Sequence, residues 1–215
     1  MIKNITPAPD WIIYQDQDIV AVNKPSGLLS VPGKNPEHKT CVLSYLHLSH
    51  PSALIVHRLD MDTSGILLLA LNKASHRALS IQFQERQTSK VYHALAAGKL
   101  SQTKGFINLP MRCDWENRPR QIIDFNQGRS AQTEWTLLNQ YSNYFSVALY
   151  PITGRSHQLR VHMKSLGHPI LGDNLYADKS TDERVNRLML HATELQFTHP
   201  TKQHQITLRC PVDFI

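Results

Sequence analysis

Apolar and polar positions in the first hundred residues predict strands joined by turns, with one helix among them. Two apolar runs, 11–14 and 19–22, flank a polar stretch and indicate a β-hairpin. Apolar residues at helical spacing within 73–85 indicate a helix, and the run over 91–97 indicates a strand after it. Helices and strands are therefore both expected to contribute to the fold.

Strands dominate the second half of the chain. The runs 133–138 and 145–150 are separated by polar turn residues and predict a second antiparallel pair. Two late strands are expected over 190–197 and 205–209. The pattern predicts the α+β class, with a mixed, largely antiparallel central sheet and flanking helices and loops.

One further helix is expected just after residue 155. Ser156 is a residue type that caps helix N-termini. Leu159, Met163 and Leu166 follow at the spacing of one helical face, and Gly167 is placed to end the helix.

The composition favours an anionic partner. The chain has 215 residues, of which 41% are hydrophobic, which suits one sizeable domain or two lobes sharing a core. Lys and Arg number 23 against 17 Asp and Glu, so the formal net charge is +6.

The chain shows no signature of secretion or membrane insertion. Residues 1–10 lack an apolar stretch, and the longest aliphatic run, 66–71, is far too short to span a bilayer. Cys41, Cys113 and Cys210 are far apart, which fits reduced thiols in a cytoplasm better than a disulfide framework.

Residues 56–65 stand out because a cation, a carboxylate and a Thr-Ser-Gly turn lie between two apolar runs. The pattern indicates a strand, a polar loop and a buried strand, which is how a rigid scaffold presents reactive groups. A second cationic cluster occupies residues 154–162.

Neither a phosphate loop nor a metal site fits the spacing of the residues that could form one. The stretch from Gly27 to Asn35 has five residues between its glycines and lacks the Ser or Thr that would meet magnesium, so turn chemistry is favoured. His157 and His162 are five apart, not the four that place two ligands on one helical face, and are expected to be hydrogen-bonded or solvated.

Five blocks in order along the chain resemble the RluA-type pseudouridine synthase family. They are residues 23–33, 57–65, 90–92, 154–162 and 168–173. The tract 113–121 is similar to the branch of the family without an extra RNA-binding domain. We therefore expect a single catalytic domain over residues 1–215 and no N-terminal accessory RNA-binding domain, since the first hairpin starts by residue 11.

The resemblance implies that uridine in structured RNA is isomerised to pseudouridine without a cofactor or a metal. The expected substrates are a 23S rRNA stem-loop and tRNA anticodon stem-loops, and the protein is expected to be a cytoplasmic monomer with no DNA or membrane partner. The alternative is a non-catalytic module or chaperone that binds structured RNA. The joint presence of Asp60, Tyr92 and Arg160 favours the enzyme.

The same resemblance assigns catalytic roles to three residues. Asp60 matches the catalytic carboxylate, which either adds to ribose C1′ or removes a proton from C2′. Arg160 matches the cation that keeps this carboxylate ionised. Tyr92 matches the residue that stacks on the target base and helps remove the C5 proton, although a phenol is a poor base at neutral pH.

Further residues are expected to contact RNA. Arg58 matches the residue that fills the place of the extruded uridine, and Leu190 would add an apolar wall to the uracil pocket. The other expected RNA-binding residues are His57, Arg118, Arg120, Arg155 and Lys164. Taken alone, Arg58 could form a surface ion pair with Asp62, and each of the other cations, Lys24 among them, could be simply solvated.

Overall fold

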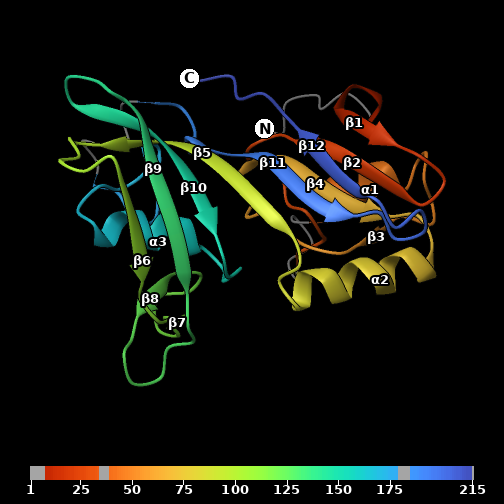
Figure 1. The fold of residues 1–215 in the computed structure, drawn as a ribbon, viewed down its shortest axis with the longest axis horizontal. Helices are drawn as coiled ribbons and strands as arrows, with labels where there is room; N and C mark the ends of the chain where they lie inside the picture. Colours follow the sequence, from red (N-terminus) through yellow and green to blue (C-terminus); the bar gives the residue numbers. More distant parts are fainter. Residues whose placement is uncertain (1–7, 34–38, 179–184, 215) are drawn as a thin grey trace. The chain divides into compact units, whose positions relative to one another are not determined.

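The computed structural model describes residues 8–33, 39–178 and 185–214, which group into two compact units. Unit 1 contains the chain up to Thr88 together with Glu194–Cys210, and unit 2 contains Ser89–Thr193 and the residues from Pro211 onward. The chain passes from unit 2 back into unit 1 within one strand, β11 (Leu190–Thr198) (Figure 1).

Unit 1 is built on antiparallel strand pairs. Its strands, besides the second half of β11, are β1 (Ile12–Gln15), β2 (Ile19–Lys24), β3 (Leu54–Ile55), β4 (Ser64–Ala70) and β12 (Gln205–Arg209). β2 pairs with both β1 and β4, β3 pairs with β4, and β12 pairs with β11. The predicted hairpin and both late strands are confirmed.

The core of unit 1 explains the longest apolar run in the sequence. Every residue of β4 is buried, because both faces of this strand are covered. Ile66 and Leu68 pack with Leu79 of helix α2 (Lys73–Gln84), which Asn72 caps by accepting a hydrogen bond from the Ser75 amide. Helix α1 (Val42–Leu46) and a short 3₁₀ segment, η1 (Ala8–Trp11), complete the unit. The predicted helix over 73–85 is confirmed.

Unit 2 is a second antiparallel arrangement. β5 (Ser89–Ala97), β10 (Tyr144–Pro151), β9 (Gln132–Gln140) and β6 (Lys104–Asn108) are neighbours in that order. Helix α3 (Gln158–Ser165) packs Leu159 and Met163 against the core that Trp135 and Phe145 form. The α+β class and the predicted pairing of the 133–138 and 145–150 strands are confirmed.

The start of α3 differs from the prediction. The N-cap is His157, in the left-handed conformation at φ 54°, and its side chain makes no capping hydrogen bond. Buried Gln158 fixes this turn instead, since its amide accepts from Thr153 Oγ1 at 2.7 Å and donates to the Gln132 carbonyl at 2.9 Å. These contacts outweigh the local capping preference of Ser156, so that prediction was wrong.

The end of α3 agrees with the sequence in part. Gly167 follows the helix at φ +82°, as expected for a C′ glycine. Leu166, however, is 38% exposed, so the apolar stripe ends at Met163.

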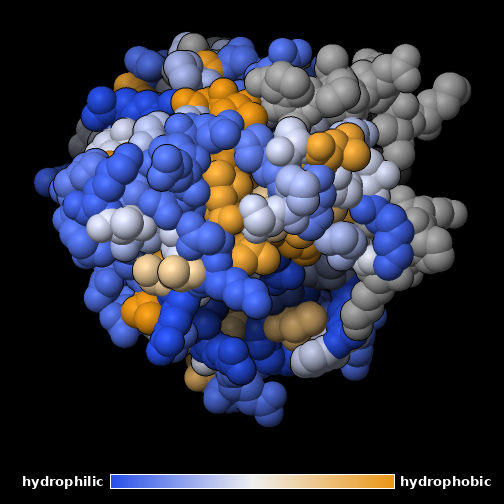
Figure 2. Space-filling model, turned by 90° about the vertical axis from the view of Figure 1, so that its right-hand side faces the viewer, coloured by the Kyte–Doolittle hydropathy of each residue, from blue (hydrophilic) through white to orange (hydrophobic). Residues whose placement is uncertain are grey.

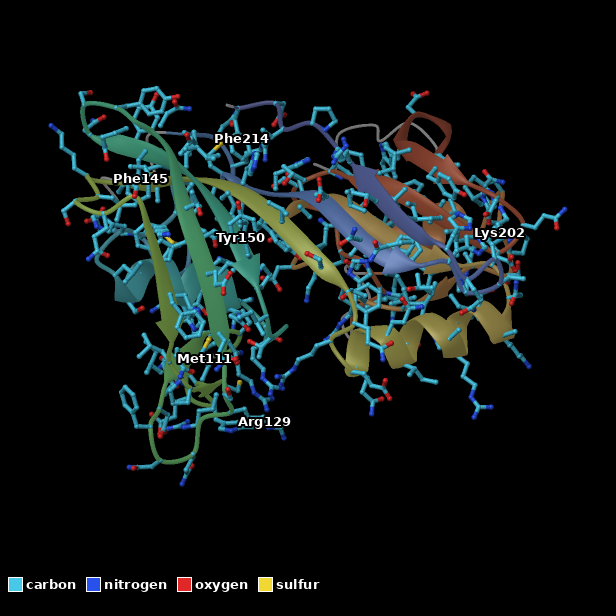
Figure 3. The ribbon with its side chains drawn as sticks, viewed as in Figure 1. Met111, Arg129, Phe145, Tyr150, Lys202 and Phe214 are labelled. Atoms are coloured by element: carbon cyan, nitrogen blue, oxygen red, sulfur yellow. The ribbon has the colours of Figure 1, made fainter. Side chains whose placement is uncertain are left out.

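A two-stranded arm extends from unit 2. We define the arm as residues 110–130, which contain β7 (Met111–Cys113) and β8 (Gln121–Ile123). The arm lies beyond one end of β6 and β9 (Figure 1). Met111 and Arg129 pair at its base (Figure 3), where Met111 is buried against Val161 of α3.

Hydrophilic side chains cover most of the face drawn in Figure 2, and a narrow hydrophobic band crosses it. Among the described residues, no helix is long and apolar enough to cross a membrane. All three cysteines lie in the described residues, and none of them forms a disulfide.

Candidate functional site

Asp60 lies on a short loop between β3 and β4 of unit 1. We call residues 57–63 the Asp60 loop. The Thr63 amide donates to the Asp60 carbonyl at 3.2 Å and closes a turn around Met61 and Asp62. Leu59 and Thr63 are buried on either side of the half-buried Asp60, so only part of the loop faces solvent.

Lys24 supports this loop from beneath. It ends β2, where it is paired with Gly65 of β4, and its side chain is completely buried. Its ammonium donates to the carbonyls of Pro25, Leu28 and Met61 at 2.8, 2.6 and 2.8 Å. The three N–H donors of one ammonium are thereby satisfied. The reading of Lys24 as a solvated cation was wrong.

Two opposing effects act on the pKa of Lys24. Burial lowers its pKa to about 7, while the nearby carboxylates of Asp62 and Asp60 oppose that shift. Three carbonyl acceptors also favour the protonated form, because neutral lysine has only two N–H donors. The buried cation in turn gives the two carboxylates a compensating charge.

Residues 26–30 hold the backbone of the Asp60 loop at further points. Ser26 Oγ donates to the Asp62 carbonyl at 2.7 Å, and the Gly27 amide donates to the Met61 carbonyl at 2.9 Å. Ser30 Oγ donates to the Leu59 carbonyl and accepts from the Leu59 amide. Gly27 has φ +82°, which confirms turn chemistry at this glycine; Lys34 and Asn35 of the same stretch lie outside the described residues.

His57 and Arg58 have different environments at the start of the loop. His57 stacks on Phe83 of α2, with 4.5 Å between ring centroids, and its Nε2 accepts from the Leu68 amide of β4 at 3.0 Å. This imidazole therefore fixes the loop onto the sheet. Arg58 is exposed, and among the described side chains no ion pair joins it to Asp62.

Tyr92 and Leu190 belong to unit 2. Tyr92 lies on β5 opposite Leu149 of β10 and packs partly against the core of the unit. Leu190 is the first residue of β11 and is buried in that core. Their predicted roles toward uracil stay predictions.

Arg160 is held rigidly in unit 2 by a carboxylate that sequence reasoning missed. Its Nε and Nη2 donate to the two oxygens of Asp173 at 2.8 and 2.7 Å, and both side chains are almost completely buried. Asp173 also accepts from the backbone amides of Leu175 and Tyr176. Such a bidentate pair fixes the plane of the guanidinium. The Gly172-Asp173 pair, which closes the last sequence block, was the signal available.

Tyr176 connects the start of α3 with the arm. Its hydroxyl accepts from the Gln121 amide of β8 at 2.8 Å and hydrogen-bonds to His157 Nδ1 at 2.7 Å. Its ring lies 5.2 Å from the guanidinium carbon of Arg160. The arm, the N-cap of α3 and Arg160 thus share one buried side chain.

The remaining predicted RNA-binding cations lie on unit 2. Arg118 and Arg120 are exposed on the arm, and Lys164 is exposed on α3. Arg155 is half-buried and donates to the Ser130 carbonyl at 3.2 Å.

The two histidines that were weighed as metal ligands have hydrogen-bond partners instead. His157 bonds to the Tyr176 hydroxyl, and His162 bonds to Thr133 Oγ1 at 2.9 Å. Burial lowers the pKa of His162 and favours its neutral form. The hydrogen-bonded interpretation is confirmed for both residues.

Within the part of the chain that the structure describes, one group of potential metal ligands lies in unit 1. Donor atoms of Asp16, Asp18 and His199 lie within 4.8 Å of one another. Lys202 and His199 both bond to Asp16 Oδ2, and the backbone amides of Asp18 and Ile19 occupy Oδ1. With these donors in place and an ammonium beside it, Asp16 is a poor cation ligand.

The support that Lys24 gives to the loop can be tested by Lys24→Met, which keeps length and removes the donors. The carbonyls of Pro25 and Leu28 would lose their ammonium donor, at about 1–3 kcal/mol each, whereas the Met61 carbonyl keeps the Gly27 amide. We expect the free energy of unfolding to fall by at least about 2 kcal/mol in urea titrations. The control Lys73→Met alters an exposed lysine of the same unit and should change the free energy of unfolding by less than about 0.5 kcal/mol. Equal stabilities of the two variants would refute the role of Lys24.

Sequence similarity to known proteins extends over almost the whole chain. A family model described as RNA pseudouridylate synthase matches residues 18–165. The dual-specificity RNA pseudouridine synthase RluA of Escherichia coli K12 is 49% identical over 211 residues, which are 97% of this chain and 96% of that protein. The protein of the same name from Vibrio cholerae is 50% identical over 210 residues, covering 97% and 86%.

Solved structures show the same fold. Human RNA pseudouridylate synthase domain containing 1 superposes with a TM-score of 0.81 at 31% identity, covering 95% of this chain and 84% of the human chain. Human RNA pseudouridylate synthase domain containing 4 gives a TM-score of 0.77 at 26% identity, covering 95% and 89%. The chain therefore belongs to the RNA pseudouridylate synthase family and is an RNA pseudouridine synthase.

Proposed function

We propose that this enzyme isomerises uridines in two classes of structured RNA, a 23S rRNA stem-loop and tRNA anticodon stem-loops. The observation that carries the proposal is the Asp60 loop, whose backbone is fixed by buried donors and so gives the Asp60 carboxylate a rigid base. Relatives that are about half identical over nearly the full chain are named dual-specificity enzymes, which supports two RNA classes. The net charge of +6 is consistent with a polyanionic substrate.

Membership of this family favours catalysis over the alternative of a non-catalytic RNA-binding module or chaperone. The matched region, 18–165, includes residues of both units, which supports one catalytic domain composed of the two. The three cysteines without a disulfide support an enzyme that acts in the cytoplasm.

The proposed reaction detaches uracil from ribose at N1 and rejoins it through C5. Asp60 either adds to C1′ as the glycosidic bond breaks or removes a proton from C2′. Formation of the C1′–C5 bond displaces Asp60 from C1′ on the first route, and C2′ regains its proton on the second. The C5 proton leaves after the new bond has formed and N1 gains a proton, so the overall step is redox-neutral. Tyr92 is proposed to stack on the uracil and to assist removal of the C5 proton.

Arg160 is proposed to keep Asp60 ionised and oriented during this step. Its bidentate bond to Asp173 supports the proposal, because a guanidinium with a fixed plane has its remaining N–H groups aimed in fixed directions. Asp173 and Tyr176 act as positioning residues for Arg160.

Asp60→Asn, which keeps the shape and removes the charge, should abolish pseudouridine formation in a stem-loop RNA. Binding of the RNA should stay within about tenfold, because phosphate contacts carry most of the affinity. The control Asp62→Asn removes a neighbouring carboxylate of the same loop and should keep activity within a few-fold. An active Asp60→Asn enzyme would contradict the assignment.

Arg160→Lys tests the fixed guanidinium while leaving a cation beside Asp173. An ammonium cannot bond in a bidentate manner, and the loss of one charged hydrogen bond of about 1.5–3 kcal/mol predicts a single-turnover rate at least about tenfold lower. The control is Arg209→Lys, since Arg209 forms an exposed ion pair with Glu194 and has no assigned role toward RNA. Its rate should stay within a few-fold.

The combination with Asp60→Asn then tests whether the two residues act together. If Arg160 works through Asp60, the double variant should be no slower than Asp60→Asn alone, because residues that act as a unit are non-additive. Multiplied losses would show that Arg160 acts independently. All variants are compared well below their melting temperatures.

Arg58→Ala tests base flipping. If this exposed guanidinium takes the place of the extruded uridine, its loss should slow reaction of a structured stem-loop far more than of a short flexible RNA. Only the structured RNA has an unstacking cost of a few kcal/mol. Arg58→Lys should restore little, because an ammonium lacks the planar stacking surface. Equal single-turnover losses on both RNAs would exclude the flipping role.

A further inference from the structure

The tip of the arm presents a tryptophan to solvent. We define the arm tip as residues 114–120. The Trp115 side chain is 64% exposed, and the guanidinium carbon of Arg118 lies 3.8 Å from the centre of one of its rings. This distance is that of a cation stacked on an aromatic face. The remaining surface of the indole stays accessible.

Hydrogen bonds within the arm tip fix the position of Trp115. The Asp114 amide donates to the Arg120 carbonyl, and the Arg120 amide donates to the Asn117 carbonyl, each at 3.0 Å. Asn117 Nδ2 also donates to the Asp114 carboxylate at 3.0 Å. An exposed indole in a loop with this internal order is positioned before any ligand arrives.

The base of the arm is rigid as well. Met111, Ala131, Val161 and Tyr176 form a small buried core. Gly128 leaves no space for a side chain, since an added Cβ would lie 2.2 Å from the Asp124 carbonyl oxygen. The Tyr176 hydroxyl then ties Gln121 of β8 to α3. A ligand on the tip would therefore be held at a fixed position relative to unit 2.

The exposed indole contributes little to the stability of the arm, because most of its apolar surface remains in water. A stacked guanidinium and an indole are together the kind of surface on which nucleobases stack. The tip holds Arg118 and Arg120 against Asp114 and Glu116, so its formal charge is zero. With no net charge, the arm tip is not expected to bind RNA by attraction of phosphates alone.

We propose that the accessible face of Trp115, backed by Arg118, is a stacking platform for one unpaired nucleobase of the RNA substrate. The proposal rests on the proposed function, since the substrate of this family is RNA. An unpaired base offers a π-face that matches the indole, whereas bases inside a continuous duplex are already stacked. The contribution of Trp115 to binding is accordingly independent of salt.

The test is the affinity of Trp115→Ala for two RNAs, a stem-loop with unpaired bases and a blunt duplex of the same stem. Stacking predicts a dissociation constant for the stem-loop that is about fivefold to hundredfold higher, with little change for the duplex. The slope of log Kd against log salt should equal that of the wild type. Trp115→Phe should restore most of the affinity. The rate at saturating enzyme should stay within a few-fold.

The matched control is Phe106→Ala, which removes a 54% exposed aromatic residue of β6 outside the arm and should leave both affinities unchanged. Protection of the Gln121 amide from hydrogen exchange reports whether the arm keeps its structure in Trp115→Ala. Quenching of fluorescence on RNA titration should disappear in Trp115→Phe, because the other tryptophans, Trp11 and Trp135, lie outside the arm.

Wild-type affinity of Trp115→Ala for the stem-loop would overturn the proposal and leave a protein partner as the use of this surface. Equal losses on stem-loop and duplex with the arm intact would also overturn it, since stacking on an unpaired base would then be irrelevant. Neither result affects the assignment of Asp60, whose test is pseudouridine formation itself.

Discussion

The buried ammonium of Lys24 is the interaction on which the geometry of the Asp60 loop depends. The β2–β4 register places Lys24 beside Gly65, so the end of one strand meets the end of the loop. Three carbonyls converge on this one cation, and that of Met61 also accepts from the Gly27 amide. The same cation lies near two carboxylates, whose charges would otherwise oppose each other within a small loop. One side chain thus satisfies the backbone and balances the charge of the loop.

Unit 2 also buries a charged side chain, but there the charge is balanced by a carboxylate. Arg160 carries a charge into the interior, and the carboxylate that balances it is itself satisfied by two backbone amides and two guanidinium N–H groups. A buried pair of this kind contributes less to stability than to a defined orientation. The hydrogen-bond acceptors of Lys24 are all backbone carbonyls, so this side chain is suited to fixing a loop backbone. The planar guanidinium of Arg160 is suited to donating hydrogen bonds in fixed directions.

The sequence predicted those features that follow from local pattern. Alternating and continuous apolar runs located most strands, and the helix over 73–85 was evident from its spacing. The burial of Lys24 was not predictable, because its partner Met61 is 37 residues away and no local pattern encodes that contact. The capping residue of α3 was misjudged for the same reason, since Gln158 bonds to Gln132 on a different strand. The family resemblance supplied the predictions for Asp60, Tyr92 and Arg160, while the pairing of Arg160 with Asp173 became visible only in three dimensions.

The proposed action on two classes of RNA raises the question of how one enzyme recognises both. Hydrogen bonds to base edges would favour one sequence, because each edge offers its own donors and acceptors. Stacking on an aromatic ring tolerates any base, since every base has a π-face. An arm with zero formal charge at its tip and an exposed indole is therefore compatible with reading the shape of a loop. A stacking contact that accepts any base can select a substrate only if the position of the contact relative to the rest of unit 2 is fixed. The rigid base of the arm fixes that position. On the proposed stacking role, selectivity among uridines depends on the spacing between the unpaired base and the target nucleotide.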